Sequence, residues 1–178
     1  MAHPIKHFKT ITKHRHKVIE HCFKAGIGFQ GLFHDLSKYS FTEFIPGAKY
    51  YTGTKSPNEG ERAEFGYSQA WLHHKGRNRH HFEYWTDHMK GKGFCPVKMP
   101  LKYVIEMFCD RVAASKIYQG ANYTDAHPYE YFDHARAMRF IHPETETFLE
   151  KLLVMLKDEG EEAAFAYIRK YIKENETY

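Results

Sequence analysis

The sequence predicts an all-α fold in a single domain. Apolar residues recur at steps of three and four positions along most of the 178 residues, and no segment shows the apolar–polar alternation of a strand. A chain of this length can bury one core without disulfides. We therefore expect one domain over residues 1–178, in which residues 128–178 form amphipathic C-terminal helices with charged outer faces.

The first predicted helix runs from Ile5 to about Ala25. Glycines 26 and 28 end it, because glycine readily adopts the left-handed conformation of a helix C-terminus. A second, short helix is expected to carry His34 and Asp35. The apolar face expected for the first helix consists of Ile5, Phe8, Ile11, His14, Val18, Cys22 and Phe23.

Further helices follow along the chain. Ser40 and Glu43 have the spacing of a capping box, and Pro100 opens the helix with the strongest apolar stripe. Residues 50–60 are rich in turn formers and predict a loop. The remaining helices are expected over residues 40–47, 61–74, from residue 80 onward, and over 129–141, 143–158 and 161–175.

Composition narrows the class of protein. The three cysteines show no C-x-x-C spacing, which argues against a disulfide framework and against a four-thiolate zinc site. The N-terminus lacks the apolar stretch of a signal peptide, and no apolar run approaches membrane-spanning length. We expect a soluble, cytoplasmic protein without a membrane partner. A homodimer is left open.

Histidine is several-fold enriched, with 14 copies, and several of these residues lie on apolar helical faces together with aspartates. Imidazole and carboxylate together suit divalent iron, manganese or zinc, with magnesium as a further candidate, and one or two ions are expected. The choice between His73 and His74 is open, as is that between His14 and its competitors His16 and His21. The candidate ligands, in chain order, are His14, His34, Asp35, His74, His80, His81 and Asp110.

The ordered pattern His14 … His34-Asp35 … Asp110 resembles that of the HD superfamily of metal-dependent phosphohydrolases. The resemblance implies an HD-like helical bundle with a metal-site core over about residues 5–118. The added His74 and the pair His80-His81 are similar to the variants of that superfamily with extra metals. The Gly-Tyr-Pro signature is absent after the pair, which argues against a cyclic-dinucleotide phosphodiesterase of the HD-GYP kind.

The chain also looks like an uncharacterised subfamily of this group, which brings no known substrate. Its members share an H-D-L-S-K segment followed by E-F, then A-W-L-H-H, R-N-x-H-H-x-x-Y-W and M-P with a later aspartate. In this chain, these motifs begin at His34, Glu43, Ala70, Arg77 and Met99, and the aspartate is Asp110.

The resemblance implies hydrolysis of a phosphate ester by metal-activated water. His14, His34 and Asp110 would hold one ion, His74, His80 and His81 a second, and Asp35 would be shared between them as a catalytic ligand. The expected partner is a small phosphorylated substrate, nucleotide-like in kind.

Basic residues beside the ligands are candidates for contact with the substrate. Lys38 is expected on the side of His34 and Asp35, where it would meet a phosphate oxygen or protonate a leaving group. Arg77 and Arg79 are candidates for a phosphate clamp, with Arg79 as the catalytic candidate. Arg111 has the weaker claim, because it points about 100° away from Asp110 on a helix.

A second hypothesis belongs to another class of protein. The aromatic content of 16 % and the cluster Arg77-Asn78-Arg79 also fit a catalytically inactive module that binds nucleotides or nucleic acid. The net charge of +4 is spread along the chain, so a nucleic-acid partner is not favoured. Salt-dependent binding without turnover would distinguish such a module from an enzyme.

Overall fold

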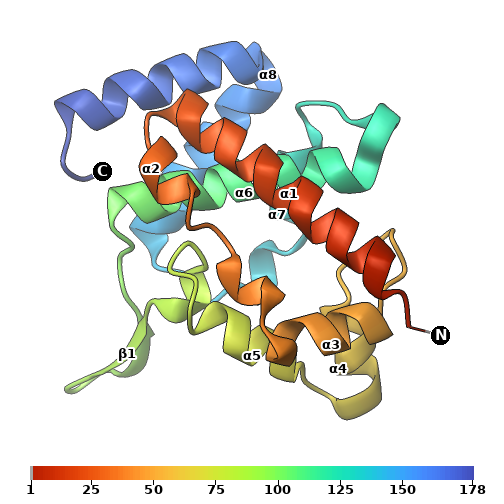
Figure 1. The fold of residues 1–178 in the computed structure, drawn as a ribbon. Helices are drawn as coiled ribbons and strands as arrows, with labels where there is room; N and C mark the ends of the chain where they lie inside the picture. Colours follow the sequence, from red (N-terminus) through yellow and green to blue (C-terminus); the bar gives the residue numbers. More distant parts are fainter. Residues whose placement is uncertain (1) are drawn as a thin grey trace.

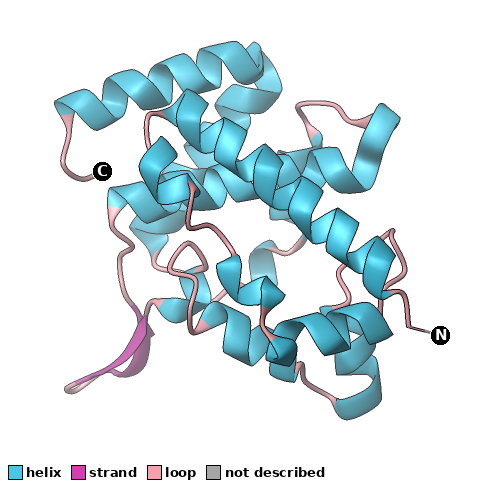
Figure 2. Ribbon diagram, viewed as in Figure 1, coloured by secondary structure: helices cyan, strands magenta, loops and turns pink. Residues whose placement is uncertain are grey.

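The structure is a computed structural model that describes residues 2–178, apart from the side chain of Met138. Met1, the first residue of the predicted domain, lies outside this range. Helices make up most of the described chain, and Figure 2 shows one small two-stranded hairpin among them. The predicted all-α class is confirmed.

The described chain contains eight α-helices and four short 3₁₀ turns, and the two turns near the site are η1, Leu36–Tyr39, and η2, Phe82–Tyr84. The helices and strands are α1 (Pro4–Ala25), α2 (Gly28–Gly31), α3 (Phe41–Lys49), α4 (Asn58–Phe65), α5 (Gln69–Lys75), β1 (Thr86–Met89), β2 (Gly93–Pro96), α6 (Leu101–Gln119), α7 (His127–His134) and α8 (Pro143–Glu174).

The core forms where α1, α6 and α8 meet. In Figure 1, α1 crosses in front of α6. Helix α8 contacts both, and its dark blue C-terminal part runs above them in this view. Burial of these apolar side chains supplies most of the driving force for the fold. Fully buried side chains of this core are Val18 and Cys22 of α1, Phe108 and Val112 of α6, and Leu149, Leu152 and Leu156 of α8.

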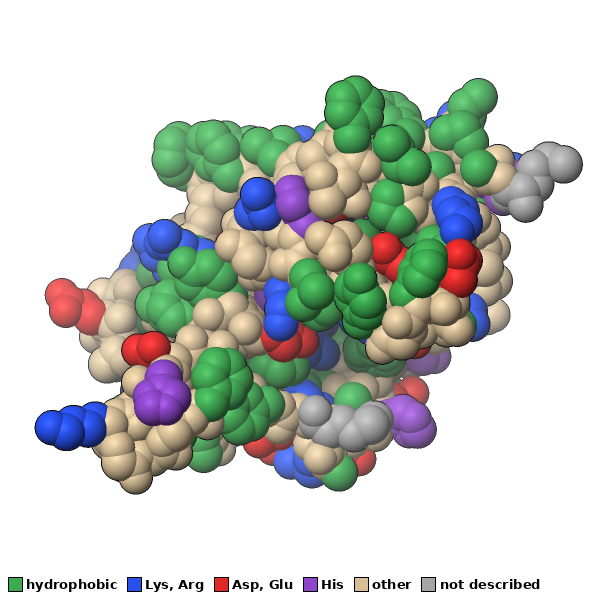
Figure 3. Space-filling view, turned by 90° about the horizontal axis from the view of Figure 1, so that it is seen from below, with side chains coloured by type: hydrophobic (Ala, Val, Ile, Leu, Met, Phe, Trp, Pro, Cys, Tyr) green, Lys and Arg blue, Asp and Glu red, His purple; other side chains and the backbone are tan. Residues whose placement is uncertain are grey.

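The buried face of α1 differs from the predicted one. Ile5 is 70% exposed, Phe8 49% and Phe23 61%, whereas His7 and His21 are buried. The face that turns inward consists of His7, Ile11, His14, Val18, His21, Cys22 and Ala25, so His7, His21 and Ala25 lie on it in place of Ile5, Phe8 and Phe23. Ile5, Phe8 and Phe23 are among the large hydrophobic side chains that the fold leaves exposed to solvent. Groups of hydrophobic side chains on the surface are visible in Figure 3.

The expected short helix around His34 and Asp35 is wrong. Helix α2 ends at Gly31, and both residues lie in the turn that leads to η1. Asp35 has φ 53°, the left-handed conformation, and is the only non-glycine residue of the described chain with positive φ. Aspartate tolerates this conformation better than most residues do, but a left-handed residue interrupts a right-handed helix. The carboxylate is therefore presented by a tight turn.

The structure of residues 80–96 also differs from the predicted one, a helix from residue 80 onward. No helix starts at His80; the chain forms η2 and then the antiparallel pair of β1 and β2, in which Thr86 is opposite Pro96. Strands of four residues, half of them exposed, are too short for a clear alternation in sequence. The prediction of no strand is thus wrong for this hairpin.

Two predicted helices are shorter than expected. Gly66, with φ 79°, divides residues 61–74 between α4 and α5, and α7 ends at His134 instead of Ile141. The capping box is also wrong, because Ser40 occupies the N-cap of α3 without a side-chain hydrogen bond. The two last predicted helices form α8 and are joined at Gly160, whose φ of 86° and ψ of 172° suit glycine alone. Within residues 2–178, none of the helices combines the length and apolar character required to cross a bilayer.

Candidate metal centre

The seven predicted ligands come together from five places in the chain. They form two groups whose ligand atoms all lie within 4.8 Å of one another inside each group, and Asp35 belongs to both. Helices α1 and α6 supply one side of the centre, and the turn at residue 35, helix α5 and the segment before η2 supply the other. The groups are His14, His34, Asp35 and Asp110, and Asp35, His74, His80 and His81.

The first group surrounds one oxygen of Asp35. Nε2 of His34 lies 3.2 Å from Oδ2 of Asp35 and 3.6 Å from Oδ1 of Asp110. Nε2 of His14 lies 2.9 Å from the same Asp110 oxygen and 4.0 Å from Oδ2 of Asp35. Two imidazoles and two carboxylates thus converge, a donor set suited to a divalent metal.

The second group surrounds the other oxygen of Asp35. Nε2 of His74 and Nε2 of His80 lie 3.3 Å and 3.4 Å from Oδ1 of Asp35. The half-buried His81 completes this group, with its Nε2 2.8 Å from Nε2 of His74. Since the two oxygens of Asp35 face different groups, this carboxylate has the geometry of a bridge between two ions.

Two buried glutamates contact Nδ1 of the histidine rings, on the side opposite to Nε2. Nδ1 of His34 donates to Oε1 of Glu106 at 3.0 Å, and Nδ1 of His80 lies 3.2 Å from that oxygen. Nδ1 of His74 donates to Oε2 of Glu43 at 2.8 Å. A proton on Nδ1 leaves the Nε2 lone pair of a neutral ring free to bind a metal, and carboxylates commonly orient metal-binding histidines in this way.

The centre contains buried polar atoms without a hydrogen bond from the described residues, although Oδ2 of Asp35 is paired with the ammonium of Lys38. Nε2 of His14, His34 and His80 and both carboxylate oxygens of Asp35 are buried without a hydrogen-bond partner among the described residues. Such atoms are costly unless something compensates them. All of them belong to the two groups, so the residues present fit one or two metal ions.

The carboxylates of the centre are ionised at neutral pH. Burial opposes their charge, but the neighbouring imidazoles, and Lys38 in the case of Asp35, outweigh it and hold the pKa of Asp35 and Asp110 well below the usual range. Burial and the adjacent His80 and His74 lower the pKa of His81. Anionic oxygens and a neutral imidazole at His81 are the protonation states that metal binding requires. At His34, burial opposes the charge, but Asp35, Asp110 and Glu106 outweigh it and raise the pKa, so a metal bound there would displace the proton.

Groups from elsewhere fix the backbone around the ligands. The guanidinium of Arg15 donates to the carbonyls of Leu32 and His34, which holds the turn that presents Asp35. Nδ2 of Asn78 donates to the carbonyl of His74 at 2.8 Å and so ties the end of α5 to the loop that carries His80. These contacts stabilise loop positions that helical geometry does not determine.

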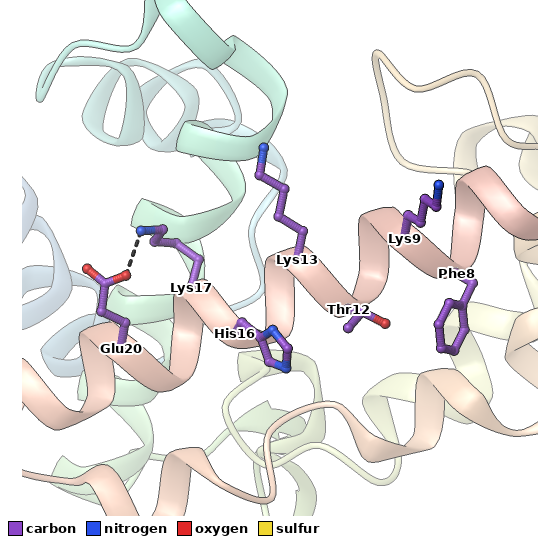
Figure 4. A pocket seen from close by; sticks show the side chains of 7 residues that line it. All are labelled: Phe8, Lys9, Thr12, Lys13, His16, Lys17 and Glu20. Atoms are coloured by element: carbon purple, nitrogen blue, oxygen red, sulfur yellow. Dashed lines mark hydrogen bonds and ion pairs between the residues drawn. The ribbon is translucent and has the colours of Figure 1, made fainter.

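The structure decides between the alternative histidines by position. Nδ1 of His73 donates to Glu43 at 2.6 Å on the outer side of that carboxylate, whereas His74 points toward Asp35. His16 is exposed and lines a shallow hollow of about 410 Å³ on the outer face of α1, where it is drawn in Figure 4. His21 is buried away from both groups. His14 and His74 are therefore the members of the centre.

The basic candidates are placed differently from one another. Nζ of Lys38 lies 2.6 Å from Oδ2 of Asp35, so the contact expected from the spacing is present. Arg79 is exposed and contacts the hydroxyl of Tyr103 and the ring of Tyr84, and no contact with a ligand residue is found in the described chain. The guanidinium of Arg77 donates to the carbonyl of His73 at 3.4 Å, and the described chain shows no hydrogen bond from it to a candidate ligand side chain. The catalytic role of Arg79 stays a prediction that these contacts do not support.

Comparison with protein families gives one match. The profile of a family described as "Family of unknown function (DUF5662)" matches residues 3–155, which is most of the chain. The chain belongs to this family. The range that matches DUF5662 contains both ligand groups as well as Glu43 and Glu106, and it ends within the first half of α8. No curated protein and no solved structure matches this DUF5662 chain.

Proposed function

We propose that the chain is a metal-dependent phosphohydrolase that acts on a nucleotide or another phosphate ester. One observation carries the proposal: Nε2 of three histidines and Oδ1 of Asp35 are buried without hydrogen-bond partners and face one another, while Oδ2 of Asp35 is paired with Lys38. The resemblance to the HD superfamily supports phosphate-ester chemistry, and the ammonium of Lys38 beside Asp35 supports an anionic substrate.

The residues of the first group would hold one divalent ion and those of the second group another, with Asp35 shared. Iron, manganese and zinc suit this mixture of imidazole and carboxylate best. Bound ions would polarise a phosphoryl oxygen and lower the pKa of water at the site. Glu106 and Glu43 orient the imidazoles by accepting from Nδ1, so the ligand geometry is set before a substrate arrives.

Lys38 supplies positive charge at the rim of the centre. Burial opposes its charge, but the carboxylates of Asp35 and Asp110 outweigh burial and raise its pKa. An ammonium with a raised pKa stays charged at neutral pH and is a weak acid. Of the two roles predicted for Lys38, binding of an anionic phosphate oxygen therefore fits better than protonation of the leaving group.

The decisive experiment compares the purified, untagged protein with a variant that combines His34→Ala and Asp35→Ala. Elemental analysis should find one or two equivalents of metal in the parent and almost none in the variant. Hydrolysis of bis(p-nitrophenyl) phosphate should occur only with the parent, stop with a chelator and return with the same metal.

Equal trace metal in both proteins after metal has been offered would refute the proposal. The rival hypothesis of a binding module would then come first, since Lys9, Lys13 and Lys17 project from the outer face of α1 in Figure 4. That module should bind an oligonucleotide with a steep salt dependence and without turnover.

A further inference from the structure

Arg111 is a charged residue beside the centre for which the described chain provides no counter-ion. It follows the ligand Asp110 directly in α6, and its Nε is buried without a hydrogen-bond partner. None of the ion pairs of the described residues includes this guanidinium, although Arg111 is half-buried and a donor buried without a partner is costly.

Two other arginines pack against the same aromatic ring as Arg111, and both have carboxylate partners. Arg111, Arg136 and Arg139 all lie against the ring of Phe132, at 5.7, 5.7 and 3.8 Å from its centre. Arg139 pairs with Glu146 at 2.8 Å, and Arg136 pairs with Asp133 at 3.0 Å and with Glu150. Only Arg111 of these three has an aromatic contact and no carboxylate.

The carboxylates whose charge acts on Arg111 include Asp110, a candidate ligand, and Glu83, and Glu83 does not serve as an internal partner. Its Oε2 is also buried without a partner, and it forms no ion pair with Arg111. A donor of Arg111 and an acceptor of Glu83 are thus both buried with their hydrogen-bonding capacity unused.

We propose that Arg111 is an anion-binding residue that receives a phosphate group of the substrate at the edge of the metal centre. Consecutive residues of a helix point about 100° apart, so a guanidinium at position 111 flanks the ions held by Asp110 instead of competing for them. Its planar donors match a phosphate in bidentate fashion. The inference rests on the proposed function.

The charge of the centre agrees with this assignment. Two divalent ions would offset the four carboxylates of Asp35, Asp110, Glu43 and Glu106. Lys38 and Arg111 then remain as the positive charges around the ions, and an incoming phosphate group compensates them. The structure therefore assigns the phosphate to the side of α6 that carries Arg111.

The test measures binding of inorganic phosphate by calorimetry to the protein as purified, beside Arg111→Met and Arg169→Met. Arg169 is exposed and donates to the carbonyl of Lys24, so its variant removes an equal charge far from the centre. We expect Arg111→Met to weaken phosphate binding at least about tenfold, the value of one charge-assisted contact. Arg169→Met should bind as the parent does.

Metal content and thermal stability are measured on the same samples. Arg111→Met should keep the metal of the parent and unfold at the same or a higher temperature, because it removes an uncompensated charge. Equal phosphate affinity in parent and Arg111→Met, no phosphate binding by the parent, or a marked loss of stability in Arg111→Met would each overturn the inference. A parent without metal would refute the proposed function instead, while the dependence on Arg111 would still be decided by the phosphate titration.

Discussion

Two buried histidines of α1, seven residues apart, have different surroundings. Nε2 of His14 has no hydrogen-bond partner and faces the carboxylates of Asp110 and Asp35. Nδ1 of His21 lies 3.3 Å from the carbonyl of Cys109, and its Nε2 lies 3.2 Å from the ammonium of Lys116. Both rings therefore pack against the same helix, α6, but only His21 has partners for both nitrogens.

The difference shows what separates a candidate ligand from a structural histidine. A ring that donates to a carbonyl through Nδ1 and accepts from an ammonium through Nε2 has used both of its polar atoms. His14 has an unsatisfied nitrogen beside anionic oxygens, which is the environment of a metal ligand. Burial and helical spacing are the same in both cases, so the partners of the ring nitrogens decide.

The largest expected effect comes from exchanging each ring for an amide of similar size. His14→Gln should lose about one equivalent of metal, and hydrolysis should fall at least about 100-fold, the value of a few kcal/mol of transition-state stabilisation. His21→Gln should retain the metal of the parent and change the rate by less than about twofold, since its amide can reproduce both contacts. Elemental analysis and turnover of bis(p-nitrophenyl) phosphate provide the two measurements.

His16→Gln serves as a control on the exposed face of the same helix, and it should match the parent in both respects. Equal metal loss in the variants of His14 and His21 would break the comparison. It would mean that α1 supports the centre as a whole and that the position of His14 is not special.

A smaller effect is expected from the carboxylate behind the rings. Glu106→Gln keeps the size of the side chain but removes the negative charge that His34 and His80 share. Loss of such an outer carboxylate typically weakens metal affinity by about 10- to 100-fold. Competition with a chromophoric chelator measures this change. If the affinity is unchanged, the glutamate only fills space, and the hydrogen bond at Nδ1 does not distinguish ligands from structural histidines.

The fold was predictable where the pattern is long and regular. The bounds of α1 and the junction at Gly160 follow from helical spacing and from glycine. The hairpin could not be predicted, because its strands have four residues and little apolar alternation. The conformation of Asp35 was equally hidden, since left-handed backbone at an aspartate depends on the contacts of the whole turn.

The candidate site was predictable as a set of residues but not as an arrangement. Metal-capable side chains on apolar faces identified both groups, while the choice of His74 over His73 required the position of Glu43. Glu106 and Glu43 were missed as partners of the rings. A usable signal existed for Glu106, a charged residue one helical turn before Asp110 on the most apolar stripe of the chain. The sequence singled out Glu43 in a capping box and in the E-F motif, but neither pattern indicates its partners His73 and His74, which are 30 and 31 residues away.

The smallest expected effect is a change in the free energy of unfolding with pH. It tests whether His21 is a neutral, structural histidine. Burial, and next the charge of Lys116, lower the pKa of His21 from 6.5 to about 4, with Glu161 and Glu20 acting in the opposite direction. Because the folded-state pKa is lower than the unfolded one, the unfolded chain binds the proton more tightly. The stabilisation by neutral His21 is complete above pH 6.5, declines as the pH falls from 6.5 to 4, and declines no further below that.

Urea unfolding of the parent and of His21→Gln should show the pH-dependent stabilisation by His21 as a difference between the two proteins. The advantage of the parent over the variant should shrink by on the order of 1–2 kcal/mol between pH 7.5 and pH 5. Other titrating groups, including the buried His7, are common to both proteins and cancel in the comparison. Parallel stability curves would show that folding leaves the pKa of His21 unchanged, and an advantage that grows toward pH 5 would show that the ring is protonated in the folded protein. Its Nε2 would then donate, most readily to Glu161, the partner of Lys116, and the contrast with His14 would have to rest on the carboxylates alone.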